Sequence, residues 1–331
     1  MHLKINVSRE ISGEQIFGGI GTHVLHMLRS SEENQIFITS KLSQDQMIYG
    51  ANKTIAFESE DFKNYGNKNK IKNLIFLIWY RFRVALFIYQ ASQSRQVEVE
   101  LAEYMFEGIF LVLIPKRIRR NITILTRLHG SSAFDRRTNT MKAKSYRNKI
   151  FWLLERIQIN RSDQVVAPTY FAKTIFQKYI KPEIEIRSNA FAITNVDKVN
   201  SDEITLTYIG SKDLEKGTDI IKKLITYFPN LQFEVLGNLR FNAPNLSSKI
   251  IPQHEMAQHL ASKRRILLVP SRSETFGYTF LEGLCYSDLV LASDIPVFRE
   301  LSSLYLASNV LFIEPLDELQ WIKTVKEIVY K

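Results

Sequence analysis

The chain has 331 residues, of which 45% are hydrophobic and 24% charged, a composition typical of a soluble globular protein with about two domains. It holds one cysteine, Cys285, which excludes an intrachain disulfide and favours a reducing compartment. Residues 1–198 carry 30 Lys and Arg against 18 Asp and Glu, or +12, whereas residues 199–331 carry 14 against 16, or −2. The basic half is therefore expected to meet an anionic partner.

The first half opens with the pattern of a strand, a glycine loop and a helix. Residues 3–7 alternate like a strand, and Gly18, Gly19 and Gly21 follow before a helix expected over 22–28. The start lacks the continuous apolar core of a signal peptide, so we expect no export. The glycines do not fit the G-x-G-x-x-G fingerprint, which counts against an NAD-dependent oxidoreductase.

The most apolar run covers residues 74–89 and has Arg81 and Arg83 in its middle. It is too short and too charged to span a bilayer comfortably. Its last part, residues 84–89, predicts a buried strand. The next segment predicts a helix that ends at Pro115, because apolar residues recur at helical spacing at Leu101, Met105, Ile109 and Val112.

Residues 122–125 predict another buried strand, and the sequence TRLHGSS follows it. Arg127, His129 and Gly130 are therefore expected at the carboxyl end of a strand, where open α/β sheets bind ligands. The stretch 116–149 carries eleven Lys and Arg and one acid. It holds just two aromatic residues, which counts against base stacking by a nucleic-acid-binding protein.

The end of the first half predicts an amphipathic helix over 152–159, a strand over 164–166, a helix capped by Thr169, and a last strand over 183–187. A polar stretch follows. We place the domain boundary there, which gives domains 1–195 and 196–331.

The second half repeats the alternation of strand and helix, with strands expected over 204–209, 232–236 and 266–269. A helix is expected over 276–286, with Ser273 and Thr275 as candidate N-caps, and then a strand over 289–292. Gly277 at the start of this helix lets a ligand approach the backbone, and the helix N-terminus favours a phosphate. Both halves are predicted to be doubly wound parallel sheets of the α/β class.

Two carboxylates frame this helix, Glu274 before it and Glu282 within it, with seven residues between them. At the helical rise they lie on the order of 12 Å apart, beyond the roughly 5 to 9.5 Å of a glycosidase acid and base pair. They are expected to contact different parts of one long ligand.

The segment PSRSETFGYTFLEG resembles the Glu, seven residues, Glu signature of family 4 retaining glycosyltransferases, and SDIPVFREL is similar to the segment that follows it there. The resemblance is firmest over residues 204–301. It implies the GT-B architecture, in which two Rossmann-like domains face each other across a cleft. Residues 1–195 would bind the acceptor and residues 196–331 the nucleotide sugar.

The resemblance also implies roles for individual residues. Glu274 would contact the sugar hydroxyls, Glu282 the ribose hydroxyls, Lys216 the diphosphate, and His129 the sugar near the reacting centre. The family usually has a basic residue directly after the first glycine, where Ser211 stands here. The implied catalytic residues are His129, Glu274 and Lys216, and the implied donor-binding residues are Gly18, Gly19, Gly210, Lys212, Lys216, Phe276, Gly277, Tyr278, Thr279 and Glu282.

The resemblance implies a hexosyltransferase-type enzyme of polysaccharide biosynthesis that acts with retention on a UDP- or GDP-sugar, with a glycan or lipid-linked acceptor and no metal or cofactor. We expect it in the cytoplasm, peripheral on the inner face of an anionic membrane through residues 105–149, although these charges can also be a solvated face. The alternatives are a basic nucleic-acid-binding protein and a catalytically inactive GT-B relative. No nucleic acid is expected as a partner, because no known nucleic-acid-binding motif is present.

Overall fold

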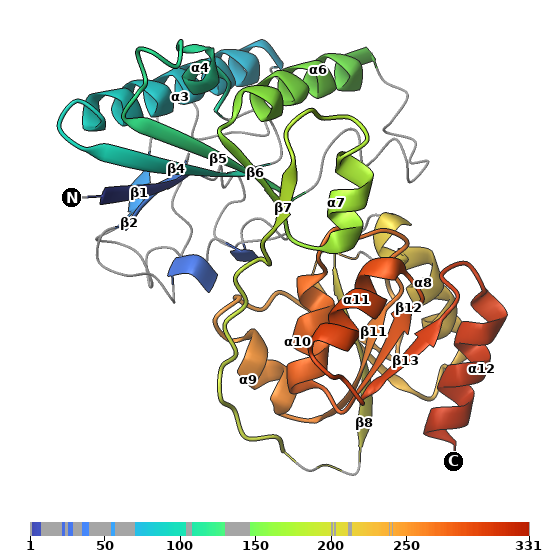
Figure 1. Ribbon diagram of the computed structural model, residues 1–331. Coiled ribbons are helices and arrows are strands. Elements are labelled where there is room, and N and C mark those ends of the chain that lie inside the picture. The colour runs from blue at the N-terminus through green and yellow to red at the C-terminus, as the bar shows by residue number, and fades with distance from the viewer. Residues whose placement is uncertain are drawn as a thin grey trace. The chain divides into compact units, whose positions relative to one another are not determined.

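The computed structural model describes residues 2–7, 22–23, 26–28, 35–39, 54–56, 70–103, 108–129, 146–199, 201, 203–210, 214–237, 239 and 241–330. The chain divides into two compact units, residues 1–192 and residues 193–331. The sequence placed the boundary after residue 195. Each unit is a parallel sheet with helices on both faces (Figure 1).

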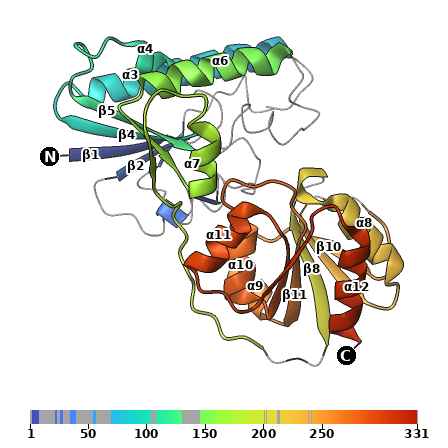
Figure 2. The same cartoon turned by 45° about the vertical axis from the view of Figure 1, so that its right-hand side comes forward.

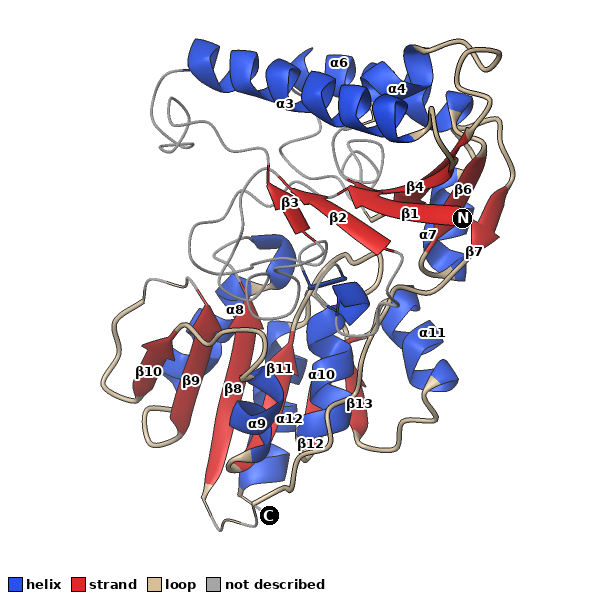
Figure 3. Ribbon diagram, turned by 90° about the vertical axis from the view of Figure 1, so that its left-hand side faces the viewer, coloured by secondary structure: helices blue, strands red, loops and turns tan. Residues whose placement is uncertain are grey.

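The described part of unit 1 forms a seven-stranded sheet in the order β3-β2-β1-β4-β5-β6-β7, with every pair parallel. Helices α3, α4 and α6 cover one face, and α7 covers the other (Figure 1, Figure 3). The strands are β1 (His2–Val7), β2 (Gln35–Thr39), β3 (Thr54–Ala56), β4 (Gln96–Glu103), β5 (Ile122–Leu128), β6 (Gln164–Ala167) and β7 (Ile184–Ile186). The helices are α3 (Lys70–Ala91), α4 (Ile109–Leu113), α6 (Tyr146–Arg161) and α7 (Tyr170–Phe176).

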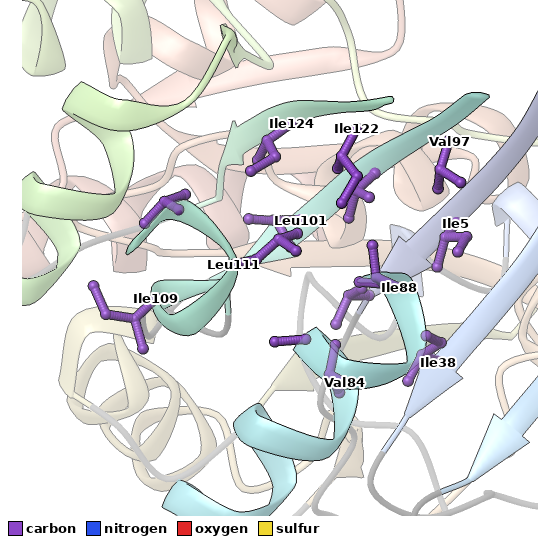
Figure 4. Packing of buried hydrophobic residues seen from close by; sticks show 14 of the residues in the cluster. Ile5, Ile38, Val84, Ile88, Val97, Leu101, Ile109, Leu111, Ile122 and Ile124 are labelled. Carbon is purple, nitrogen blue, oxygen red and sulfur yellow. The ribbon is translucent and has the colours of Figure 1, made fainter. Parts of the chain in front are cut away.

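The core of unit 1 lies between α3, α4 and the central strands, where branched side chains from the sheet meet Val84 and Ile88 of α3 (Figure 4). The prediction of a strand over 84–89 is wrong, because these residues form the last turns of α3. Phe76, Tyr80, Val84 and Ile88 recur at every fourth residue, so a helix places all four against the sheet.

The prediction of a helix through Leu101 is also wrong. Residues 96–103 form β4, in which Val97, Val99 and Leu101 alternate with polar residues and are buried, and the helix α4 begins only at Ile109. The strand predicted over 122–125 is confirmed and extends to Leu128.

The remaining predictions for unit 1 are confirmed where the structure describes the residues. Residues 22–23 and 26–28 are helical. The predicted helix 152–159 lies inside α6, and the Thr169 hydroxyl accepts from the Ala172 amide at 3.1 Å as the N-cap of α7.

The described part of unit 2 forms a six-stranded parallel sheet in the order β10-β9-β8-β11-β12-β13. Helices α8 and α12 cover one face, and α9, α10 and α11 the other (Figure 2). The strands are β8 (Ile204–Gly210), β9 (Gln232–Gly237), β10 (Leu246–Lys249), β11 (Arg264–Val269), β12 (Leu289–Ser293) and β13 (Val310–Ile313). The helices are α8 (Thr218–Tyr227), α9 (Met256–Ala261), α10 (Tyr278–Tyr286), α11 (Pro296–Leu304) and α12 (Glu318–Val329).

This strand order places a topological switch point between β8 and β11, because the chain leaves β8 toward one edge of the sheet and leaves β11 toward the other. Open α/β sheets bind ligands outside the carboxyl ends of the strands at such a point. The loops after β8 and β11 are therefore the first place to look for a site. None of the described helices is both long enough and apolar enough to cross a bilayer.

Candidate functional site

The two loops at the switch point of unit 2 approach each other closely at Gly217. The loop after β8 leads into a 3₁₀ turn, Leu214–Lys216, and Gly217 then caps α8 with a φ of 70°. A Cβ atom built on Gly217 would lie 2.1 Å from the carbonyl oxygen of Pro270, in the loop after β11. Glycine is therefore required here both by the backbone conformation and by the space available.

Arg272 fixes the same two loops to each other. Its backbone amide donates to the Glu215 carbonyl at 2.8 Å, and its guanidinium donates to both carboxylate oxygens of Asp219, at 2.9 and 2.5 Å. Burial alone would raise the pKa of Asp219, but the hydrogen bonds from Arg272 outweigh it and lower this pKa. No local pattern in the sequence indicates this pair, whose members are 53 residues apart.

Beside this connection Lys216 and Glu274 form an ion pair. The Lys216 Nζ donates to Glu274 Oε1, and the Ser271 hydroxyl donates to the same oxygen at 3.1 Å. The side chains keep 39% and 15% of their surfaces exposed. An anion that reaches this place from solvent can therefore meet the ammonium group, and a hydroxyl can meet the carboxylate.

The start of α10 lies directly after this pair in the chain. The helix begins at Tyr278, two residues later than predicted, and its N-cap is Gly277 rather than Ser273 or Thr275. Gly277 has a φ of 89°, and a Cβ atom there would lie 2.6 Å from the Phe298 ring. This cap offers no side-chain hydrogen bond to the first amides of the helix. Those amides are therefore suited to an anionic ligand.

Phe276, Tyr278 and Gly210 shape the surroundings of these amides and of the carboxyl end of β8. Phe276 and Tyr278 are both buried and pack edge to face at 5.0 Å, which fixes the backbone on both sides of Gly277. Gly210 ends β8 opposite Gly237 of β9, where a Cβ atom on Gly237 would lie 2.2 Å from the Gly210 carbonyl oxygen. The strand ends thus stay close together.

Glu282 is buried in the second turn of α10, with 4% of its surface exposed. Its Oε1 accepts a hydrogen bond from the Gln253 side-chain amide, which comes from the loop before α9. The two predicted glutamates thus have different partners on different elements. Gln253 is a residue that sequence reasoning missed, because it precedes Glu282 by 29 residues and belongs to no motif.

His129 stands directly after β5 in unit 1, as predicted. Its Nδ1 lies 3.4 Å from the Asn189 side-chain amide, and its ring centroid lies 4.9 Å from that of His23. Burial lowers the pKa of His129 well below its ordinary value, and the nearby His23 and Arg127 lower it further. The imidazole is therefore neutral at neutral pH.

Arg127 was expected at the carboxyl end of a strand, and it is the penultimate residue of β5. Its Nε donates to Glu100 of β4 at 2.6 Å, and its Nη1 donates to the Arg187 carbonyl at 2.7 Å. The Arg127 and Glu100 side chains are 4% and 1% exposed. This arginine connects strands of the sheet and is too enclosed to meet a ligand.

Seven of the predicted site residues lie on the elements around the carboxyl end of β11: Lys216, Glu274, Phe276, Gly277, Tyr278, Thr279 and Glu282. His129 belongs to unit 1. The predicted residues Gly18, Gly19 and Lys212, with Ser211 and Gly130, lie outside the described residues.

No protein-family model matches the chain. It is 20% identical over 315 residues to an uncharacterized 41.2 kDa protein in the cps region of Klebsiella pneumoniae, which covers 88% of this chain and 82% of that protein. It is 34% identical over 87 residues to the O-antigen chain mannosyltransferase RfbU of Salmonella typhimurium, a match that covers 25% of this chain and 24% of RfbU.

Two solved structures resemble the chain over nearly its whole length. Sucrose-phosphate synthase from Thermosynechococcus elongatus is 14% identical with a TM-score of 0.71, over 99% of this chain and 90% of that one. The Anabaena protein HepE, in complex with UDP and glucose, is 12% identical with a TM-score of 0.70, over 98% of this chain and 89% of that one. At such identities the likeness concerns the fold. The chain has the two-domain α/β fold of the GT-B glycosyltransferases.

Proposed function

We propose that the chain is a metal-independent glycosyltransferase that moves a sugar from a nucleotide sugar with retention at the anomeric carbon, as the family 4 transferases do. The observation that carries the proposal is the accessible Lys216–Glu274 pair beside the start of α10, at the switch point of unit 2. HepE, which shares the fold, was solved with UDP and glucose, and RfbU is a mannosyltransferase. Both likenesses support a nucleotide-sugar donor.

The leaving group of such a reaction is a nucleoside diphosphate, on which negative charge grows as the bond to the sugar breaks. The Lys216 ammonium and the backbone amides that follow Gly277 are suited to take up this charge. These groups do by themselves what a divalent cation does in other transferases. We therefore expect activity without added metal.

Binding of a diphosphate would also change the state of Glu274. In the structure Lys216 donates to this carboxylate, so a phosphate that takes over Lys216 leaves Glu274 with the Ser271 hydroxyl. The Glu274 oxygens can then accept hydrogen bonds from sugar hydroxyls. The exchange couples occupation of the diphosphate position to recognition of the sugar.

Glu282 is proposed to hold the ribose hydroxyls, with Gln253 orienting its carboxylate. Replacement of Glu282 with alanine is expected to raise the Kd for the nucleotide roughly tenfold to a hundredfold, for loss of charge-assisted hydrogen bonds worth about 1.5 to 3 kcal/mol. Calorimetry measures this change. Glu327→Ala, at an exposed position of α12, is the matched control and should bind normally.

A thermal-shift screen with UDP, GDP, ADP and their sugars identifies the donor, because a ligand at 100 times its Kd adds about 2.7 kcal/mol of stability. Release of the free nucleotide from one of these sugars then separates an active enzyme from an inactive relative. Unchanged nucleotide affinity in a folded Glu282→Ala variant would contradict the proposed donor site.

His129 is proposed to act in turnover more than in donor binding, through contact of its neutral imidazole with the sugar. His129→Ala should lower kcat while the nucleotide Kd measured by calorimetry stays nearly constant. If turnover stays at the level of the parent protein, His129 is a structural loop residue. The acceptor is proposed to be a glycan or a lipid-linked saccharide at the inner face of a membrane.

A further inference from the structure

The outward face of α3 is apolar. Ile75, Ile78, Phe82 and Leu86 follow each other at spacings of three and four residues, so they form one stripe along the helix. Their exposed fractions are 55%, 51%, 54% and 38%. The opposite side of the same helix packs on the sheet through Phe76, Tyr80, Val84 and Ile88. A helix at the surface normally turns mainly polar residues to water, whereas α3 also exposes these four large apolar side chains.

The apolar surface continues on the neighbouring helices of the same layer. The Phe82 ring packs edge to face against Phe110 of α4 at 6.4 Å, and α4 packs against both α3 and α6 (Figure 3). Leu113 of α4 and Leu153 of α6 are about half exposed. Apolar side chains that gather over three helices in this way mark an interaction surface.

The segments that carry this surface are strongly basic in sequence. Residues 70–91, 109–121 and 146–161, which contain α3, α4, α6 and the turn after α4, hold twelve Lys and Arg and a single acid, Glu155. Glu155 is buried. The guanidinium of Arg83 lies 5.8 Å from the Trp79 ring, and that of Arg156 lies 5.3 Å from the Trp152 ring. Trp79 and Arg83 thus flank the apolar stripe on α3 itself, and Trp152 and Arg156 form a like pair on α6.

Two of the basic residues that the sequence assigned to a membrane surface form ion pairs within unit 1. Lys116 and Arg119 both pair with Asp163, at 2.8 and 2.6 Å, and the Arg119 side chain is buried. Arg117 and Arg120 in the same turn are exposed. The surface is therefore better defined by α3, α4 and α6 than by residues 105–149.

We propose that the outer face of α3, α4 and α6 lies on an anionic lipid bilayer, with α3 in the plane of the headgroups. At 22 residues α3 is about 33 Å long, and its stripe would enter the boundary between headgroups and acyl chains while the basic side chains meet lipid phosphates. Two copies joined through this face would set like charges against each other. A nucleic acid binds basic side chains through its phosphates and would leave the apolar stripe exposed to water.

The test is sedimentation of the full chain with vesicles of phosphatidylcholine, alone or mixed with phosphatidylglycerol, in the absence of nucleotide. We expect the chain to bind the mixed vesicles and to dissociate from them as the salt concentration rises. Added salt shortens the Debye length, which is already about 8 Å at physiological salt, and so weakens the attraction between the charges. The double variant Ile78→Gln, Phe82→Gln should bind at least about tenfold more weakly. Its unfolding midpoint should fall only slightly, because both side chains are about half exposed and the Phe82–Phe110 ring contact is the one packing interaction described above that is lost.

The matched control is Leu304→Gln with Leu319→Gln, two exposed leucines of unit 2, which should bind vesicles like the parent chain. The variant Arg117→Gln, Arg120→Gln should bind mixed vesicles more weakly. Equal binding to neutral and anionic vesicles would overturn the proposal, as would unchanged binding of the Ile78, Phe82 variant. Self-association would also overturn it: the parent chain would then form a dimer in solution and bind no vesicles, and the Ile78, Phe82 variant would be a monomer.

Membrane binding through this surface is a property separate from the proposed reaction and does not depend on it. Vesicle binding that persists in a chain with no nucleotide affinity would contradict the donor site alone. Nucleotide binding without vesicle binding would contradict the membrane surface alone.

Discussion

One ion pair joins two central strands of unit 1, another joins the loops after β8 and β11 of unit 2, and the two pairs differ in exposure. Arg127 and Glu100 of unit 1 are 4% and 1% exposed, whereas Lys216 and Glu274 of unit 2 are 39% and 15% exposed. A buried charge cannot lose its partner without a large desolvation cost, but a half-exposed charge can be solvated or bound by something else. The first pair is therefore suited to hold strands together, and the second to exchange partners with a ligand.

The surroundings of Glu100 show how a buried carboxylate stays ionised. Burial alone would raise its pKa, but the nearby His23, whose Nε2 lies 3.9 Å from Glu100 Oε1, and the charges of Arg127 and Lys4 hold this pKa far below its ordinary value. Lys4 Nζ lies 3.1 Å from its second oxygen. Arg127 and Lys4 thus both pair with the Glu100 carboxylate, and each of them would lose this partner if Glu100 were replaced.

The largest effect is expected from breaking the buried pair. Arg127→Met should lower the free energy of unfolding of unit 1 by roughly 3 to 5 kcal/mol, because it leaves the Glu100 carboxylate buried without its main counterion. Chemical unfolding followed by the fluorescence of Trp79 and Trp152, both in unit 1, measures this. The double variant Arg127→Met, Glu100→Leu should recover much of the loss. A single-variant cost below about 1 kcal/mol would mean that the pair is less enclosed than its exposure indicates.

A pH effect of similar kind is expected from Glu234 of β9, a buried carboxylate of unit 2. Burial would raise its pKa, but hydrogen bonds from His259 and Lys249 and the charge of Arg265 lower it to about 2. Because the folded-state pKa lies below the unfolded one, the stabilisation is complete above about pH 4.5 and is lost as the pH falls toward 2. The loss for unit 2 should be on the order of 3 kcal/mol.

This is measured by urea unfolding at several pH values, with Trp321 as the probe of unit 2. The variant Glu234→Gln should be less stable than the parent at neutral pH and should show a flatter dependence between pH 5 and 2. Glu327→Gln, at an exposed position, should retain the dependence of the parent. An equally steep curve for Glu234→Gln would show that other carboxylates carry the acid sensitivity.

Breaking the exposed Lys216–Glu274 pair should have the opposite result. We expect a large effect on ligand binding and a small effect on the free energy of unfolding. Lys216→Ala is expected to weaken binding of the nucleoside diphosphate roughly tenfold to a hundredfold and to change the free energy of unfolding by no more than about 1 kcal/mol. Calorimetry and urea unfolding test the two statements separately. A strongly destabilised variant with normal affinity would reverse the assignment of the two pairs.

The smallest effect is expected at Lys223 and Glu318, which join α8 to α12 with side chains 52% and 39% exposed. Lys223→Ala should cost about 0.2 to 1 kcal/mol at low salt and less as salt rises, because solvent and ions already screen the pair. Its nucleotide affinity should equal that of the parent, which makes it the matched control for Lys216→Ala. A cost above 2 kcal/mol would be inconsistent with this ranking by exposure.

The sequence predicted unit 2 better than unit 1 for a physical reason. The strand, loop, helix and strand from residue 264 to 293 follow one another directly, and each has a clear local pattern. In α3 the outer stripe at Ile75, Ile78, Phe82 and Leu86 is as apolar as the inner one. The 3.6-residue periodicity therefore disappears, and residues 84–89 look like a continuous apolar strand.

The candidate site was predictable as a set of positions but not as a set of contacts. The resemblance in sequence indicated Lys216, Glu274, Gly277 and Glu282, and the roles given to them stay predictions. Their partners Gln253 and Ser271 could not be named, because tertiary structure brings them together. The prediction of the N-cap of α10 was also wrong. The backbone at this position is left-handed and lies close to Phe298, and both features require glycine, which has no side chain to act as a cap.

The first helical residues that the structure describes in unit 1 bind the last residues of that unit. The Nδ1 atoms of His23 and His26 accept from the backbone amides of Ala190 at 3.1 Å and Ala192 at 3.0 Å. These contacts span 167 and 166 residues. At synthesis rates of about 5 to 20 residues per second, the ribosome completes the partner amides roughly 10 to 30 s after it has made the histidines. During that interval these two hydrogen bonds cannot form, so unit 1 cannot complete its structure before residue 192 has been made.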